Sequence, residues 1–417
     1  MQLKTILNRL ERYPGFVIGR AALVERGAIV TVEVELSGDG RSRPRCSVCR
    51  VPRPGYDRLK LRRFQFVPLW GLAVFFLYAP RRVDCPSCGI KVEHLPWASG
   101  KKHLSHAFAW FLATWAKRMS WGEVARAFGI SWEHVFRSVE LAVQWGLAHR
   151  TLDGIRAIGI DEVLWHRGHK YLTVVYQIDQ GIKRLLWVGR DRTDETIGSF
   201  FAWFGESRNA ALEYVCTDMW KPYLKAIATW AKQAVNVVDR FHVMQKFSKA
   251  VDDVRAEEAK ALGKKAKGKV LKHTRWCLLK RPENLTEKQE ATLKDLLRLN
   301  LRTVRAYLLK EDFQGLWQYV SAGWAAKFID RWCKRAMRSR LQPMMKVAQT
   351  IRNHRALILN WFKAKGQLSS AAVEGLNNKL KVITRRSYGF RTFKATKVAL
   401  YHTLGQLPEP EGAHRFC

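Results

Sequence analysis

Three acidic residues lie in sequence contexts that suit a shared catalytic site. Asp161 lies inside Ile155–Val188, a stretch rich in branched and aromatic residues that predicts three β-strands. Asp218 ends a second, short apolar segment, and Glu374 lies in a late segment with helical spacing. An aspartate inside a strand is unfavourable unless something compensates it, and a bound metal ion is a common compensation. Each acid alone fits an exposed, solvated carboxylate as well, but together they predict a metal site.

Phosphodiester cleavage and strand transfer are the reactions that three such carboxylates can support. Two divalent ions about 3.5–4 Å apart activate the attacking oxygen and stabilise the leaving oxygen. Magnesium prefers a few carboxylate oxygens, completed by water and the phosphate of the substrate. We therefore predict two magnesium ions, with Asp161 bridging them, Asp218 binding one and Glu374 binding the other.

The late helix that carries Glu374 also carries amides and cations close to one face. Ser369 or Ser370 is expected to cap this helix at its N-terminus. An acid followed one turn later by amides and cations suits a catalytic carboxylate beside a DNA strand. A solvated amphipathic helix would have the same pattern. The residues predicted to support the site or contact DNA here are Asn377, Asn378, Lys381, Arg385 and Arg386.

The charge of the chain indicates a polyanionic partner. The formal net charge is +37 over 417 residues, with a sequence pI near 10.3. Lys and Arg that neutralise phosphates release condensed counterions, so DNA is the expected partner. The longest very apolar run, Leu69–Ala79, has about half the roughly 20 residues that a membrane span needs. The N-terminus lacks the apolar core of a signal peptide, so we expect a cytoplasmic protein.

Four cysteines form two Cys-x-x-Cys pairs, Cys46 with Cys49 and Cys85 with Cys88. Two such pairs offer four thiolates, which is the usual ligand set of a structural zinc site. The alternative is a set of unrelated redox or core cysteines. We predict one structural zinc ion.

The segment between residues 103 and 150 has helical spacing with two capping signals. Ser120 and Glu123 form a capping-box pattern, and Ser131 follows a Gly-Ile turn and can cap a second helix. Helix, glycine turn and helix is the layout of a helix-turn-helix, whose second helix enters the major groove. A plain helical hairpin in the core is the alternative. The residues predicted to face DNA are Ser131, His134, Arg137 and Ser138.

After the first three strands the sequence alternates helix and strand. Helices are predicted over Thr193–Phe204 and Lys221–Lys232, and strands over Tyr214–Asp218 and Ala234–His242. Such alternation predicts parallel strands added to the opening hairpins, which is a ribonuclease-H-like arrangement. A strongly basic helical region follows, in which Ala259–Val270 is expected to be a linker.

Beyond these separate features, almost the whole chain resembles a family of bacterial transposases, the ISL3 family. The segments that carry the resemblance are Gly159–Glu162, Thr217–Tyr223, Val238–Val243, Val373–Asn378 and Arg385–Phe390, with the cysteine pairs and helix-turn-helix ahead of them. The resemblance implies a DDE transposase with a ribonuclease-H-like core, a helical insertion before Glu374, and magnesium or manganese as cofactor. It also implies that Asp239 and His242 support the active site or nearby DNA. Asp239 competes with Asp218 as the second metal ligand, and we favour Asp218.

We thus expect a multidomain α+β protein. The predicted segments are 1–100 (zinc-binding), 101–152 (helix-turn-helix), 153–242 (first part of the catalytic core), 243–366 (basic all-helical insertion), 367–405 (last part of the core, with Glu374) and 406–417 (tail). The expected activity is cleavage at terminal inverted repeats and joining to target DNA, within a homodimer or larger assembly on the nucleoid. The alternatives are a DNA-binding repressor or architectural protein without catalysis, and a ribonuclease-H-like nuclease.

Overall fold

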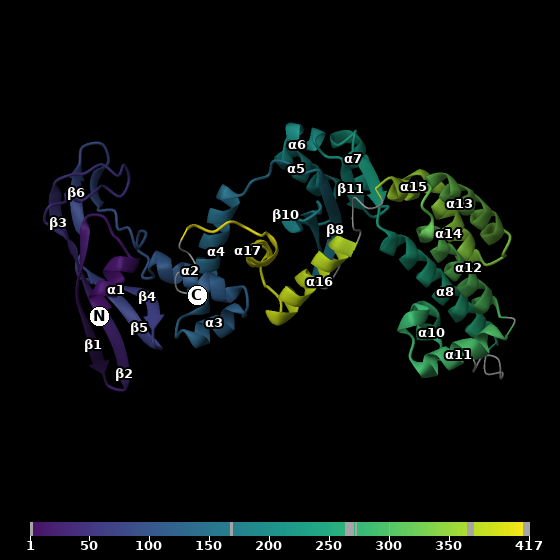
Figure 1. The fold of residues 1–417 in the computed structure, drawn as a ribbon, viewed down its shortest axis with the longest axis horizontal. Helices are drawn as coiled ribbons and strands as arrows, with labels where there is room; N and C mark the ends of the chain where they lie inside the picture. Colours follow the sequence, from purple (N-terminus) through teal and green to yellow (C-terminus); the bar gives the residue numbers. More distant parts are fainter. Residues whose placement is uncertain are drawn as a thin grey trace. The chain divides into compact units, whose positions relative to one another are not determined.

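The computed structural model describes residues 3–166, 170–262, 271, 273–299, 301–364 and 371–411. The chain divides into two compact units, Met1–Arg150 with Ile383–Cys417, and Thr151–Val382 (Figure 1). The six segments predicted from the sequence are finer than this division and stay predictions. The structure adds that the chain from Ile383 onward belongs with the N-terminal unit. The expected caps Ser369 and Ser370 lie outside the described residues.

The first unit begins with a short helix and two sheets. Helix α1 (Leu3–Leu10) precedes a four-stranded sheet of order β1-β2-β5-β4 and a three-stranded sheet of order β3-β6-β7. The strands are β1 (Phe16–Arg26), β2 (Ile29–Gly38), β3 (Gly55–Arg58), β4 (Arg62–Leu69), β5 (Leu72–Tyr78), β6 (Arg81–Cys85) and β7 (Gly89–Val92). Buried Trp97 packs against the larger sheet. The rings of Phe16 and Tyr78 lie edge-on to the Trp97 ring, with ring centroids 4.8 and 5.3 Å away. Such aromatic pairs add to the stabilisation that burial gives.

Three helices continue the first unit and confirm the predicted helix–turn–helix order. They are α2 (His106–Ala116), α3 (Trp121–Ala127) and α4 (Trp132–His149). Ser120 and Glu123 form the expected capping box, and the Ser131 hydroxyl accepts the His134 backbone N–H. Gly129 has φ 60°, so glycine suits the turn between α3 and α4. The last helix, α17 (Phe393–Leu404), packs on α4.

A buried histidine in α17 makes the first unit sensitive to acid. Burial, together with the charges of Lys117 and Arg386, lowers the pKa of His402 to about 3. Because the unfolded chain binds a proton near pH 6.5 and the folded chain does not, stability is full above pH 6.5 and falls towards pH 3. We expect the free energy of unfolding to drop by about 3 kcal/mol between pH 6.5 and pH 4 from this group.

Chemical denaturation at a series of pH values measures this effect. His402→Leu should flatten the slope between pH 6.5 and pH 4, and the matched exposed change His103→Gln should keep it. An unchanged slope in His402→Leu contradicts the prediction.

The second unit is built on a five-stranded sheet of order β10-β9-β8-β11-β12. The strands β8 (Ala157–His166), β9 (Lys170–Gln177) and β10 (Arg184–Arg190) are antiparallel neighbours, and β11 (Tyr214–Thr217) and β12 (Val235–Val238) join as parallel strands. Helices α5 (Asp194–Phe204) and α7 (Lys221–Trp230) bury Phe200, Phe201 and Tyr223 against this sheet, and the short α6 (Glu206–Ala210) joins α5 to β11. The predicted elements are therefore present, with three antiparallel and two parallel strands.

The predicted end of the last strand of the sheet is wrong. The last strand was expected to run through His242, but β12 ends at Val238 and α8 (Arg240–Leu262) begins two residues later. The Asp239 carboxylate accepts the Phe241 backbone N–H at 2.8 Å, which satisfies a donor at the helix start. His242 therefore lies in the first turn of a helix.

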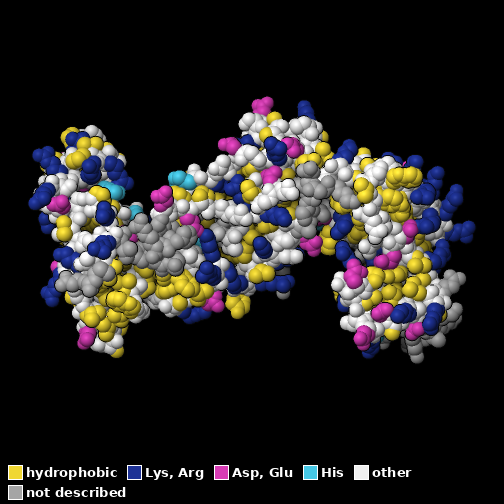
Figure 2. Space-filling view, in the orientation of Figure 1, with side chains coloured by type: hydrophobic (Ala, Val, Ile, Leu, Met, Phe, Trp, Pro, Cys, Tyr) yellow, Lys and Arg dark blue, Asp and Glu magenta, His cyan; other side chains and the backbone are white. Residues whose placement is uncertain are grey.

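The predicted insertion is all-helical. After α8 come α10 (Arg275–Leu279), α11 (Glu287–Leu297), α12 (Arg302–Gln314), α13 (Ala322–Met337), α14 (Gln342–Asn353) and α15 (Arg355–Lys363), with short 3-10 turns at Pro282–Asn284 and Gly315–Gln318. The expected linker Ala259–Val270 is wrong in its first part, since α8 continues through Leu262; residues 263–270 lie outside the described residues. Figure 2 shows Lys and Arg side chains along the edge of this insertion where α13 and α14 lie.

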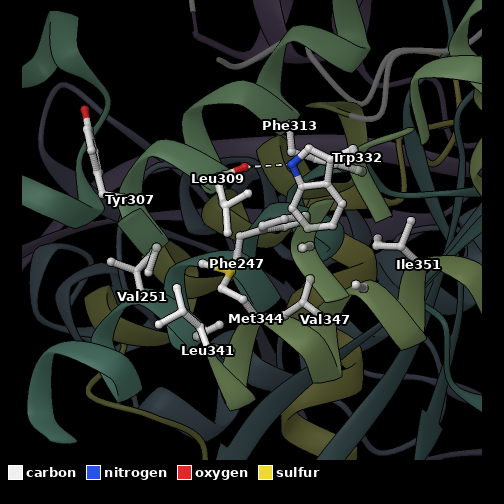
Figure 3. Packing of buried hydrophobic residues seen from close by; sticks show 14 of the residues in the cluster. Phe247, Val251, Tyr307, Leu309, Phe313, Trp332, Leu341, Met344, Val347 and Ile351 are labelled. Atoms are coloured by element: carbon white, nitrogen blue, oxygen red, sulfur yellow. Dashed lines mark hydrogen bonds between the residues drawn. The ribbon is translucent and has the colours of Figure 1, made fainter. Parts of the chain in front are cut away.

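The insertion has its own hydrophobic core (Figure 3). Phe247 of α8 stacks on Phe313 of α12 at 4.5 Å, and Trp332 of α13 packs edge-on against both. The Trp332 indole N–H donates to the Leu309 carbonyl at 2.9 Å, so its polar edge is satisfied inside the core. Among the described residues, no helix of the chain is long and apolar enough to cross a membrane.

Candidate active site

Three acids lie on or directly after the neighbouring strands β8, β11 and β12 of the five-stranded sheet. In the parallel ladders Cys216 pairs with Gly159, and Thr217 pairs with Val238. Continuing these registers brings Asp218 level with Asp161 on β8 and with Asp239 after β12. Neighbouring strands lie about 4.8 Å apart, so acids at the same level lie close together. The sheet thus gathers the predicted ligands Asp161 and Asp218 together with Asp239.

Asp161 is held by residues from two other elements. The Asn377 amide, on helix α16 (Ala371–Arg386), donates to the Asp161 carboxylate, and the Tyr176 hydroxyl on β9 donates to the Asn377 carbonyl oxygen at 2.8 Å. His242 Nε2 lies 3.8 Å from Asp161 Oδ1. Because Tyr176 fixes which way the Asn377 amide points, the carboxylate is oriented before any ion binds.

The close approach of α16 to the sheet depends on Gly159. A Cβ atom at this position would lie 2.4 Å from Cγ2 of Val373, which is impossible unless the Val373 side chain or one of the two backbones moves. Successive residues of a strand face opposite sides, so Ile158 and Ile160 reach the core under α5 and α7 while Gly159 faces α16. Since Val373 immediately precedes Glu374, this contact sets where the third acid lies.

Glu162 and Arg192 belong to the site, and the sequence did not single them out as site residues. Arg192 Nε lies 2.8 Å from Glu162 Oε1, and its Nη2 lies 3.5 Å from Asp218 Oδ2. The guanidinium also lies over the Trp220 ring at 4.3 Å. Glu162 adjoins Asp161 in the strand, but Arg192 follows β10 in a polar loop whose charges gave no signal of such a contact. A cation thus lies between two acids of the site.

Burial raises the pKa of several of these carboxyl groups. Burial is the main cause for Asp161 and Asp239, and it raises the pKa of Glu162 to about 7, against the lowering effect of Arg192. Close acids repel one another, which adds to the effect. Glu162 Oε1 is buried without an aligned hydrogen-bond donor among the described residues, although Arg192 is within ion-pair distance. Several partly buried carboxyl groups that raise one another's pKa fit a site for divalent cations.

Glu374 lies at the edge of this group. It is exposed on α16, and with Asp239 it lines a hollow of about 390 Å³. The other lining residues come from α8, α10, α12 and the loop after α10, and include Arg240, Met244, Arg281, Lys310 and Gln314. Asn378 beside it is also exposed, whereas Asn377 is buried. The carboxylates therefore adjoin a hollow with a basic wall, formed by the insertion.

The oxygens of Asp161, Asp218 and Glu374 do not form one tight cluster. Among the described residues, the four cysteines alone form a group of three or more potential ligands whose atoms all lie within 4.8 Å of one another. In a two-metal site the ions lie about 4 Å apart, and each ion lies about 2.1 Å from its ligand oxygens. Two carboxylate oxygens that bind different ions can therefore be up to about 8 Å apart. A separation of up to about 8 Å between the Asp218 and Glu374 oxygens is therefore compatible with the predicted assignment.

The two cysteine pairs meet in the first unit, as the zinc prediction requires. The Cys49 and Cys85 sulfurs are 3.7 Å apart, and all four sulfurs lie within 4.8 Å of one another. Backbone N–H groups of Cys49 and Val48 lower the pKa of the Cys46 thiol, which favours the thiolate form that metals bind. This cluster can hold a zinc ion.

The residues predicted to contact DNA differ in their surroundings, and the prediction for Ser138 is wrong, because its side chain is buried and its hydroxyl donates to the His134 backbone carbonyl. The Ser131 hydroxyl and the His134 Nδ1 atom are hydrogen-bonded at 2.7 Å. Exposed Arg137 pairs with Glu133. Lys381 and Arg385 are exposed. Arg386 instead donates to the backbone carbonyls of Lys117 and Arg118 after α2, so its guanidinium serves the fold of the first unit.

Comparison with known proteins identifies the family of this chain. A family model described as a transposase, of the ISL3 DDE group, matches residues 158–400. The chain is 31% identical over 426 residues to the transposase of insertion sequence IS1557 from Mycobacterium tuberculosis, covering 92% of this chain and 94% of that protein. It is 28% identical over 349 residues to the transposase of IS1001 from Bordetella parapertussis, covering 83% of this chain and 85% of that one.

These matches define an enzyme that cuts and joins DNA. The chain belongs to the ISL3 family of DDE transposases. Transposition of an insertion sequence is therefore its function, and DNA is its substrate.

Proposed function

We propose that the second unit is a ribonuclease-H-like core that cleaves DNA at the ends of an insertion sequence and transfers the freed 3′-hydroxyl to target DNA with two divalent ions. The observation that carries this proposal is the register that brings Asp161, Asp218 and Asp239 to one level of the sheet, with Glu374 on the helix docked over Gly159. Sheet order and strand directions also support the ribonuclease-H-like assignment.

In this proposal Asp161 would contribute to holding both ions, Asp218 one of them and Glu374 the other. The ions, magnesium or manganese, supply activation of the attacking oxygen and stabilisation of the leaving one. Asn377 orients Asp161, and His242 lies within reach of the same carboxylate. Asp239, which accepts the Phe241 backbone N–H, is assigned to support rather than to metal binding.

Arg192 has a separate part in this proposal. Its guanidinium pairs with Glu162 and Asp218, so it offsets the repulsion between neighbouring carboxylates before ions and DNA bind. Arg240 and Arg281 in the wall of the hollow then offer positive charge to the DNA backbone beside Glu374.

DNA recognition is assigned to the first unit. Its helix-turn-helix, through exposed Arg137, and its zinc module would bind the terminal inverted repeats. Since two ends must be brought together for transfer, we propose a homodimer or larger assembly, associated with the nucleoid in the bacterial cytoplasm.

Product analysis tests the proposal. The protein is incubated with labelled duplexes carrying the end of its own insertion sequence and an unlabelled target, with magnesium, manganese or EDTA. Metal-dependent joining of the labelled strand to the target is expected. Free ends without joining would favour a nuclease, and binding without any cleavage in either metal would favour a repressor or architectural protein.

A further inference from the structure

Tyr388 is a fully exposed aromatic residue in an unfavourable backbone conformation. Its exposure is 100% and its φ is 52°. A bulky residue with positive φ is uncommon, because its Cβ crowds the backbone. Such strain persists where the surrounding structure imposes it, and it is frequent at functional positions.

The strain arises from the way α16 ends. The Gly389 N–H donates to the Thr384 carbonyl at 2.8 Å and the Tyr388 N–H donates to the Arg385 carbonyl at 3.0 Å. In this type of helix end, the residue after the cap takes the left-handed conformation and is usually glycine. Here tyrosine takes it, and Gly389, at φ 88°, is one position later. Folding alone favours glycine at position 388, so the ring requires another explanation.

Neighbouring residues anchor this turn to the first unit. Arg386 donates to the carbonyls of Lys117 and Arg118, and buried Phe390 packs against Trp121 of α3 at 5.4 Å. Because contacts on both sides fix the backbone, Tyr388 is held away from the protein on the unit that carries α3 and α4.

The charge around the ring indicates the class of its partner. Arg385 and Arg391 are exposed on either side of Tyr388, and the sequence has no acidic residue between Glu374 and Glu409. Cations flanking a fixed aromatic ring match a nucleic-acid strand, whose bases stack on the ring while its phosphates meet the cations.

We propose that Tyr388 contacts one nucleotide of the bound DNA end, with Arg385 and Arg391 on the flanking phosphates. This inference rests on the proposed binding of DNA by the first unit, and it adds a second contact element to the helix-turn-helix. The ring would contact a base at a strand end or at a distorted step, where a base face is accessible.

Tyr388→Gly separates folding from binding. Because glycine accepts positive φ, this variant should raise the apparent Tm by about 2–4 °C. Loss of one stacked base should weaken DNA binding by about 5- to 100-fold.

Binding is measured by fluorescence anisotropy in the full-length Asp161→Asn background, with duplex ends that are blunt or carry a 3′ overhang. Gln406→Gly, at another position with positive φ in the same unit, is the control and should bind DNA normally.

Tyr388→Phe identifies the chemistry of the contact. Retained affinity indicates stacking by the ring, and a loss equal to that of Tyr388→Gly indicates a hydroxyl–phosphate hydrogen bond; both support a nucleotide contact. Unchanged affinity in Tyr388→Gly overturns the inference. So does a loss of self-association without DNA, measured by sedimentation, because the ring would then contact a second copy of the chain. If the parent protein itself binds no DNA end, it is the proposed function that fails.

Discussion

Asp161→Asn is expected to abolish strand cleavage and transfer, lowering the single-turnover rate by at least about 10³-fold. The neutral amide loses the charge that should bridge both ions, and interactions with such ions are worth several kcal/mol in the transition state. The fold should survive, because the substitution keeps the size of the side chain and an oxygen that can accept the Asn377 amide N–H. DNA affinity, measured by anisotropy, should stay within about twofold of wild type, since phosphate contacts dominate affinity.

A matched control is Asp194→Asn, the same change at an exposed position of α5 in the same unit, which should cleave at nearly the normal rate. Full cleavage by Asp161→Asn in magnesium would refute its assignment as the bridging ligand.

The same assay separates the two candidates for the second ligand. Asp218→Asn should match Asp161→Asn, whereas Asp239→Asn should lose only about 10- to 100-fold, as outer partners of metal ligands do. The reverse order would assign the second metal to Asp239.

The sheet of the second unit was predictable because its strands are short, apolar and separated by clear turns. Branched and aromatic residues fix β8, β9 and β10, and the alternation that follows fixes β11 and β12 as parallel strands. Local sequence therefore determined which acids end up at the sheet centre. The start of α8 at Arg240 was missed because Phe241 extends the apolar pattern of Val235–Val238, although Asp239 is unfavourable in a strand and common as a helix cap.

The pairing of charges in the site could not be predicted. The contact of Arg192 with Glu162 and Asp218 joins a loop to two strands, and nothing in the local sequence of Arg192 distinguishes it from other surface arginines. Gly159 illustrates the same limit, since its importance appears only when α16, more than two hundred residues later, lies against it. Likewise, the packing of α17 on α4 depends on surfaces that each look like ordinary amphipathic helices.

Cys46→Ser is expected to remove zinc from the protein and unfold the smaller sheet of the first unit. The buried core of this region consists of Cys46, Val83 and Cys85, with Cys49 and Cys88 packed against it. Three short strands with so few apolar residues cannot offset the entropy of ordering them. Zinc on four thiolates contributes about 10–16 kcal/mol in small zinc domains, so it should supply most of the stability of this sheet.

Zinc content of the purified protein, by mass spectrometry of the metal, should fall from one ion per chain to none in Cys46→Ser, and limited proteolysis should then cut within residues 40–95. If this module contacts DNA, affinity for the DNA end should fall together with the zinc content. The second unit should remain protease-resistant, because its sheet and core are separate. Cys277→Ser, a buried cysteine in the insertion, is the matched control and should keep its zinc. A Cys46→Ser protein that is as protease-resistant as wild type would mean that the hydrogen bonds of β3, β6 and β7 suffice without metal. The four thiolates would then serve a purpose other than holding the sheet together.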